Sequence, residues 1–175
     1  MLILAAITSL MQYLITLEND LSQHCPDKCP SCGKAGLWGH GVYYRKPDRE
    51  SGVLNPIPIH RFLCPHCKHT CSVLPECIPP RRWYLWEAQQ AALQLLLSGQ
   101  SLRAIAMALT PGRSTISRWW NRFKEQFLRH ESALRSRCAD LGRAAGIVNF
   151  WKACLEKYSL ATAMRLCFIE GVTVP

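Results

Sequence analysis

The chain has 175 residues, of which 49% are hydrophobic and only 19% are charged, so it is neither disordered nor fibrous. Its length suits one or two small folded domains with apolar cores. Lys and Arg outnumber Asp and Glu by 21 to 12, and the resulting net charge of +9 indicates a polyanionic partner or an anionic membrane surface.

Residues 1–21 are predicted to form an N-terminal amphipathic helix. The segment is apolar, but it is shorter than the roughly 20 residues of a membrane-spanning helix and has no basic start typical of a secretory signal. Ser9 and Gln12 have the spacing of a capping box, which predicts a helix that begins near Leu10. The leucines expected on its apolar face are Leu10, Leu14 and Leu17. We expect no membrane attachment and a cytoplasmic, reducing compartment, where clustered cysteines bind metal more often than they form disulfides.

Residues 22–80 are rich in cysteine, proline and glycine and are predicted to form a small β zinc ribbon. Two short extended runs, Gly41–Tyr44 and Ile57–Leu63, are its expected strands. Such a domain has too little apolar core to fold unaided. The pair Pro79–Pro80 marks its expected end.

Two Cys-x-x-Cys motifs are the strongest chemical signal in this segment. Each places two thiols in a tight turn, with the spacing that a tetrahedral Zn²⁺ ion requires. Two such turns complete the coordination shell, which predicts a structural site. Gly33 permits a left-handed backbone after the first motif, whereas Lys68 takes the same place in the second. The predicted ligands are Cys29, Cys32, Cys64 and Cys67.

Other assignments of the cysteines stay open at this point. Cys25 or Cys71 is near enough in sequence to replace one of the ligands. Each Cys-x-x-Cys motif also resembles a thiol–disulfide oxidoreductase site, although the proline-rich context lacks the helix that follows such a site. The cysteines that lie in helical patterns are interpreted as small buried hydrophobic residues: Cys138, Cys154 and Cys167.

Residues 81–130 are predicted to form a helix-turn-helix domain. A helix over Trp83–Ser98 is followed by a short helix capped by Ser101, and Thr110–Arg113 forms a turn. A longer basic helix then begins with Ser114 as its N-cap. This succession lets the last helix enter the major groove of double-stranded DNA.

The last of these helices has an apolar and a polar side. Its core residues are expected to be Ile116, Trp119 and Phe123. The side chains expected to contact DNA are Arg113, Thr115, Ser117, Arg118, Asn121 and Arg122. The competing interpretation is a plain helical bundle whose arginines form a solvated face.

Residues 131–175 are predicted to form a C-terminal helical extension, with two short helices in Asn149–Glu170 that extend the bundle or form a dimer contact. A nuclease with an acid triad needs carboxylates placed by β-strands, but the acids here lie in helical patterns. They are interpreted as surface charges: Glu131, Asp140, Glu156 and Glu170. The predicted fold class is α+β, mostly α, with a small β zinc ribbon followed by a helix-turn-helix and helical bundle.

The stretches CPSCGK, HGVYYRK, RFLCPHCKHTCSVLPECIPP and SLRAIAMALTPGRSTISRWW follow one another in the chain. Together they resemble the front part of bacterial insertion-sequence transposases, over roughly residues 25–125. Those proteins pair an N-terminal zinc ribbon with a helix-turn-helix that binds the ends of the element, and short element-linked proteins carry this region without the remainder. The resemblance implies ligand roles for the four cysteines of the two motifs and a DNA-contacting role for Arg113–Arg122.

The sequence therefore predicts a zinc-dependent, sequence-specific DNA-binding protein of a mobile element, without enzymatic activity. Its expected partners are double-stranded DNA and either a second copy of the chain or a separate transposase subunit. An alternative is a zinc-stabilised protein-interaction module whose basic charge is incidental. A Cys-x-x-Cys thiol–disulfide oxidoreductase is the third class considered.

Overall fold

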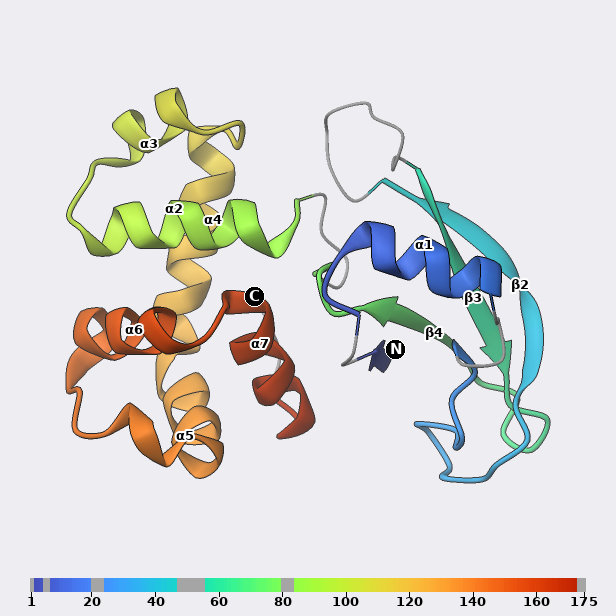
Figure 1. The fold of residues 1–175 in the computed structure, drawn as a ribbon. Helices are drawn as coiled ribbons and strands as arrows, with labels where there is room; N and C mark the ends of the chain where they lie inside the picture. Colours follow the sequence, from blue (N-terminus) through green and yellow to red (C-terminus); the bar gives the residue numbers. More distant parts are fainter. Residues whose placement is uncertain (1, 5–6, 20–23, 47–55, 80–83, 173–175) are drawn as a thin grey trace. The chain divides into compact units, whose positions relative to one another are not determined.

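In a computed structural model, the chain folds as two compact units, Met1–Leu85 and Trp86–Pro175 (Figure 1). Among the residues that the structure describes, the first unit contains the β-strands and one α-helix, and the second unit is helical. The fold class is thus α+β and mostly helical, as predicted. The structure describes residues 2–4, 7–19, 24–46, 56–79 and 84–172. Pro80 of the expected boundary and Trp83, the expected first residue of a helix, lie outside the described residues.

The sheet of the first unit has three antiparallel strands, β2 (Trp38–Arg45), β3 (Ile57–Leu63) and β4 (Thr70–Pro75). A short strand, β1 (Leu2–Leu4), pairs in parallel with β4, so the strand order is β1-β4-β3-β2. Strand β3 has the predicted bounds, and β2 extends the predicted run at both ends. Sequence analysis did not predict β1 or β4. Strand β1 has only three residues, and β4 buries consecutive residues and so shows no alternation.

Helix α1 (Leu10–Asn19) is part of the core of this unit. Its start has the predicted cap, because the Gln12 N–H donates to Ser9 Oγ at 3.2 Å. The side chain of Gln12 also reaches back, but its Oε1 accepts from the N–H of Thr8, one residue before the cap, at 3.2 Å. Tyr13 is buried, and its hydroxyl donates to the carbonyl of Pro58 at 3.0 Å. The helix packs in an apolar cluster with Ile57 and Ile59 of β3, Leu74 of β4 and Ile78, which follows β4, and the predicted leucines are half-buried there. Within the described ranges, no helix has both the length and the apolar character needed to cross a bilayer.

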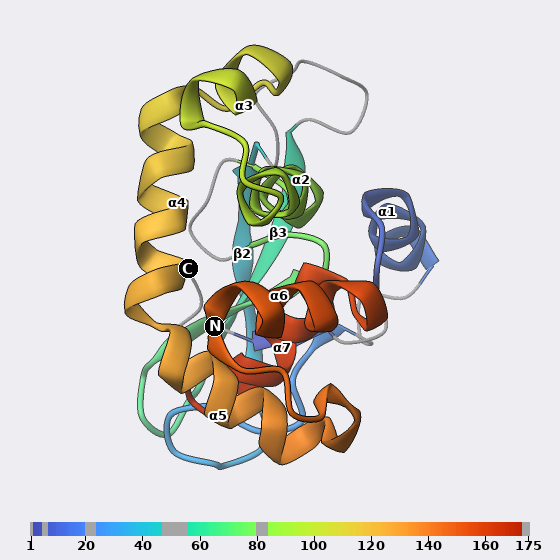
Figure 2. The ribbon, with the colours of Figure 1, turned by 90° about the vertical axis from the view of Figure 1, so that its left-hand side faces the viewer.

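The second unit is built from α2 (Trp86–Leu97), α3 (Leu102–Ala108), α4 (Arg113–Glu125), α5 (Phe127–Arg137), the 3₁₀ turn η2 (Ala139–Leu141), α6 (Gly146–Lys157) and α7 (Leu160–Ile169) (Figure 2). Ser101 is the N-cap of α3 as predicted, and its Oγ accepts from the Ala104 N–H at 3.2 Å. The prediction that Ser114 caps α4 is wrong. Gly112 is the N-cap, and its carbonyl accepts from the Ile116 N–H at 3.2 Å.

The helices from α5 onward complete the same core on which α4 rests. Phe123 of α4 lies edge-on to Trp151 of α6, with ring centroids 5.2 Å apart, and Trp151 also contacts Phe150. The cysteines Cys138, Cys154 and Cys167 are buried in this core, as small apolar residues would be. The C-terminal helices therefore hold α4 in place.

Candidate functional site

The two Cys-x-x-Cys motifs adopt turns with the same pattern of backbone hydrogen bonds. In each turn the first cysteine donates to the carbonyl five residues later and accepts from the N–H four residues later. In the first turn the N–H of Cys29 donates to the carbonyl of Lys34 (2.8 Å), and the N–H of Gly33 donates to the carbonyl of Cys29 (2.8 Å). In the second turn the N–H of Cys64 donates to the carbonyl of His69 (3.0 Å), and the N–H of Lys68 donates to the carbonyl of Cys64 (3.0 Å). The second turn thus repeats the backbone geometry of the first.

Both turns require a left-handed residue directly after the second cysteine. Gly33 has φ 73° and Lys68 has φ 60°, and Lys68 is the one residue other than glycine with positive φ among those that the structure describes. A left-handed backbone costs about 1–2 kcal/mol for a residue with a Cβ. The second turn therefore tolerates a strained residue that the first turn avoids.

We expect Gly33→Ala to lower the free energy of unfolding of the metal-loaded protein by about 1–2 kcal/mol, because alanine is strained at positive φ. Lys68→Gly should cause no loss, because it relieves the same strain. Gly39→Ala is the matched control, since Gly39 has no positive φ and a Cβ there would also meet no atom within 4 Å. Denaturant titration measures the free energy of unfolding of all three variants. Equal losses for the Gly33 and Gly39 variants would contradict the backbone explanation.

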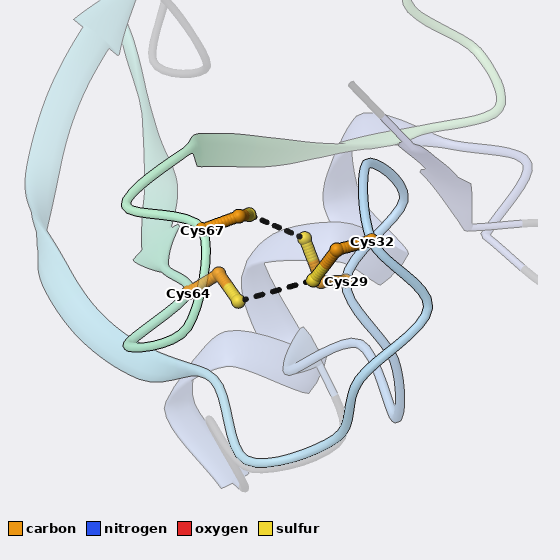
Figure 3. Close-up of side chains that lie close together, drawn as sticks. All are labelled: Cys29, Cys32, Cys64 and Cys67. Atoms are coloured by element: carbon orange, nitrogen blue, oxygen red, sulfur yellow. Dashed lines mark hydrogen bonds between the residues drawn. The ribbon is translucent and has the colours of Figure 1, made fainter.

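The two turns bring four thiols together (Figure 3). The Sγ atoms of Cys29 and Cys67 are 3.6 Å apart, and so are those of Cys32 and Cys64, so each thiol of one turn faces a thiol of the other. All four sulfur atoms lie within 4.8 Å of one another. The sheet aligns the turns, because Trp38, close after the first turn, pairs with Leu63, directly before the second. The cluster could hold a metal ion.

Backbone amides around the cluster favour thiolates at two positions. The backbone N–H groups of Cys32 and Ser31 lower the pKa of Cys29. The Ser31 nitrogen lies 3.4 Å from the Sγ of Cys29. The N–H of Cys67, with a further contribution from His66, lowers the pKa of Cys64 to about 6. These amides stabilise negative charge on one sulfur of each turn.

At Cys32 the backbone N–H of Lys34 also favours the thiolate, but partial loss of hydration and the three neighbouring thiols raise the pKa to about 11. Four sulfurs this close repel one another when they are all ionised. A bound cation would remove that penalty, because it offsets the like charges.

The alternative ligands Cys25 and Cys71 lie outside the four-thiol group. Cys71 is buried with Phe62 and Val73, and Cys25 packs against the same apolar cluster. Burial raises the pKa of both thiols, with nearby Asp27 adding to the effect at Cys25. In the described part of the chain, the candidate metal group consists of the four cysteines that the spacing predicted.

Helix α4 separates its apolar and polar residues as its sequence pattern predicts. Its buried residues are Ile116, Trp119 and Phe123. Of the residues expected to contact DNA, four are exposed, namely Arg113, Arg118, Asn121 and Arg122, and two are half-buried, namely Thr115 and Ser117. The guanidinium of Arg118 donates to Thr115 Oγ1 at 3.4 Å.

Helix α4 belongs to a compact group of three helices. Helix α3 packs against α4, and α2 packs against both. Figure 2 shows α3 beside the N-terminal end of α4. The four residues between α3 and α4 include Pro111, which is buried, and Gly112, which starts α4. The turn is therefore short enough to keep the exposed start of α4 next to α3.

Sequence reasoning did not single out the aromatic side chains of β2. Trp38, Tyr43 and Tyr44 are all exposed. The run HGVYYRK indicates an aromatic-rich strand, but the sequence of the run does not show whether its side chains are exposed or buried in the folded unit.

Comparison with known proteins identifies one family. The model of DUF6431, described as a domain of unknown function, matches residues 29–119, which include all four cysteines of the cluster and α4 as far as Trp119. No curated protein and no solved structure matches the chain. Because the matched region covers just over half of the sequence, the chain belongs to the DUF6431 family.

Proposed function

We propose that this protein is a zinc-dependent, sequence-specific DNA-binding protein of a mobile element, with no nuclease site of its own. The observation that carries the proposal is the exposed polar side of α4. Arg113, Arg118 and Arg122 lie at the surface of a helix whose opposite side is buried, directly after a short helix and a tight turn. This is the arrangement by which a helix-turn-helix presents its second helix to the major groove.

Zinc is the metal that the cysteine cluster fits best. Thiolates are soft ligands, and a tetrahedral site with Zn–S bonds of about 2.3 Å has sulfurs about 3.8 Å apart. The closest sulfur pairs here are separated by 3.6 Å. Four cysteines fill the coordination shell of the ion, so zinc would crosslink the two turns structurally. An oxidoreductase needs only one exposed, reactive pair, so the four-thiol arrangement supports that alternative less well.

The distribution of charge supports a polyanionic partner for the helical unit. Residues 83–137 contain eight Lys and Arg residues against three Asp and Glu residues, and this stretch includes α4. Arginine binds phosphates and also grips guanine edges with two hydrogen bonds, and asparagine does the same with adenine. Arg118 and Asn121 are therefore suited to reading bases, and Arg113 and Arg122 to holding the backbone.

The acidic residues of the C-terminal helices support a role without catalysis. Glu131 pairs with Arg135 at 2.9 Å, and Glu170 pairs with Arg137 at 2.5 Å. Asp140 lies 3.3 Å from Lys157 Nζ. These carboxylates neutralise basic side chains, within α5 in the first pair and on other segments in the other two, whereas a two-metal nuclease needs them grouped around the ions.

The resemblance to the front part of insertion-sequence transposases suggests the biological setting. We propose that the protein acts as an accessory subunit, a truncated transposase or a regulator of such an element. It would work with a second copy of itself or with a separate transposase subunit. The proposed compartment is the cytoplasm, where thiols stay reduced and available to zinc.

The test of this proposal is the salt dependence of duplex binding. The zinc-loaded full chain should bind a labelled 20-base-pair duplex of arbitrary sequence (a length of about two turns), and its affinity should fall as salt rises. Two or three phosphate contacts give a slope of about −2 to −3 in a plot of log K against log salt concentration. Fluorescence anisotropy at four salt concentrations measures the slope. A protein-interaction module predicts no binding at about 50 mM salt, and that result would overturn the proposal.

A further inference from the structure

We propose that strand β2 is a second nucleic-acid surface, which binds the unpaired bases of a single strand on its exposed aromatic side chains. The proposal extends the proposed DNA-binding function to the first unit and, in that respect, rests on it. Its ligand differs from the duplex assigned to α4, so the two surfaces can be tested independently.

The first observation is the exposure of β2. Trp38, Tyr43 and Tyr44 are 62%, 37% and 71% exposed, and Val42 between them is 44% exposed. Of the ten large hydrophobic side chains that are exposed in the described part of the chain, these four share one strand, and they include all of the exposed aromatic rings among the ten. Strands β3 and β4, in contrast, bury most of their apolar side chains. A concentration of aromatic rings on one exposed strand marks a binding surface rather than scattered surface residues.

The position of β2 in the sheet explains this exposure. It is an edge strand and, in the described part of the chain, pairs with β3 only. Tyr44 stands opposite Pro58 and Val42 opposite His60, on the sheet face away from α1. Trp38 stands opposite Leu63 and Tyr43 opposite Ile59, so these two rings project from the other face. The buried sheet residues of the apolar clusters on both faces belong to β3 and β4, so the rings of β2 stay open on both sides of this edge strand.

The end of β2 nearest the cysteines combines a ring with positive charge. Trp38 pairs with Leu63, so it lies at the level where β3 enters the second cysteine turn. Lys34 belongs to the first turn and Lys68 to the second, and both are exposed. A base stacked on Trp38 would therefore have its phosphates near two ammonium groups.

The exposed charges in the described part of the ribbon favour one type of partner. In residues 24–46 and 56–79 the exposed basic side chains are Lys28, Lys34, Lys46, Arg61 and Lys68. The acids in these ranges are Asp27, which is exposed, and Glu76, which is buried. This excess disfavours a second copy, because two equally basic surfaces repel each other, and favours a polyanion.

The aromatic side chains of β2 favour a single strand over a duplex as the ligand. In a duplex the flat faces of the bases are stacked on one another, and only their edges are accessible. In a single strand the faces are free, and aromatic side chains stack on them whatever the base sequence. An aromatic strand flanked by lysines is thus suited to unpaired bases, of either DNA or RNA.

The test uses the zinc-loaded full chain and three labelled probes: a 20-nucleotide oligo-dT, a 20-nucleotide oligo-rU and a duplex of the same length. Trp38→Ala and Tyr44→Ala are expected to weaken binding of the single strands by at least about fivefold each, and to leave duplex binding unchanged. Trp38→Phe and Tyr44→Phe should retain most of the affinity, because a ring remains for stacking. The matched control is Ile15→Ala, which removes an apolar side chain that is 50% exposed on α1 of the same unit.

Unchanged single-strand binding by the Trp38→Ala, Tyr44→Ala double variant would overturn the proposal, and so would a wild-type chain that does not bind either single strand. If the double variant instead loses only self-association, as measured by light scattering, β2 is a protein interface and the proposal is also wrong. Neither result touches the duplex function. The duplex function fails separately if the wild type does not bind the duplex, or if Arg122→Ala binds it as the wild type does. A preference for oligo-dT or oligo-rU identifies the natural type of strand.

Discussion

Removal of zinc is expected to unfold the first unit while the helical unit stays folded. The ribbon has only small apolar clusters on the two faces of its sheet, whereas the helical unit has a large core of its own. Zinc bound to four thiolates contributes on the order of 10–16 kcal/mol of apparent folding free energy in small zinc domains, which exceeds the stability of most domains of this size. A chelator should therefore abolish the tertiary signal of the ribbon and leave most of the helical signal.

The corresponding variant is Cys64→Ser. It removes one buried sulfur from the cluster, so the protein should lose its zinc and its ribbon should unfold. Cys25→Ser is the matched control, because Cys25 lies close in sequence but outside the four-thiol group. Metal analysis and circular dichroism measure both effects.

We expect one zinc per chain in the wild type and in the Cys25→Ser variant. Less than half an equivalent in wild-type protein prepared with zinc would contradict a structural zinc site. Zinc loss in the Cys25→Ser variant, with zinc retained in Cys29→Ser, would show instead that the ligand set is wrong. An unchanged melting profile of Cys64→Ser would mean that the fold does not depend on the metal.

Arg118→Ala is expected to weaken specific DNA binding by about 1–3 kcal/mol and to relax the preference at one base pair. Arg118 is exposed one turn into α4, where the helix would lie deepest in the groove, and it contacts Thr115 beside it. Arg122 lies one turn further on, where a helix usually rises towards the DNA backbone. Arg122→Ala should therefore weaken binding to all duplexes alike and lower the salt slope by about one unit.

The control for both variants is Arg129→Ala on α5. It also removes an exposed arginine from a helix of the same unit, so it changes the net charge by the same amount. Titrations with a selected target and an unrelated duplex, each at two salt concentrations, separate loss of base recognition from loss of phosphate contact. If Arg118→Ala and Arg129→Ala gave the same binding curve, α4 would be an ordinary bundle helix with a solvated face.

Features that depend on residues close in sequence were predictable. The spacing of Cys29, Cys32, Cys64 and Cys67 identified the thiols that the structure brings together. Ser101 was identified as a cap because its hydroxyl serves an amide only three residues away. In both cases the feature is a local one, a turn or a helix cap, and it depends on the types of a few consecutive residues.

The start of α4 shows where this local reasoning fails. Ser114 is a good N-cap residue, but the helix starts earlier, at Arg113, with Gly112 as its cap. Pro111 is buried in the preceding turn, so its packing is part of what sets where the chain turns into the helix. The burial of Pro111 is a property of the folded unit and is absent from the local pattern.

Features that depend on distant segments were decided by the tertiary structure. The pairing of β1 with β4 joins residues about seventy positions apart, and neither strand is recognisable by its own pattern. Lys68 has a left-handed backbone in a turn that repeats the backbone hydrogen bonds of the first, although its residue type disfavours that conformation. The open rings of β2 likewise depend on what the rest of the unit leaves uncovered. The sequence by itself determined the chemistry of the thiols and the amphipathic character of α4, because these follow from residue type and spacing. Exposure, strand pairing and strain required the fold, because each depends on contacts between residues far apart in the chain.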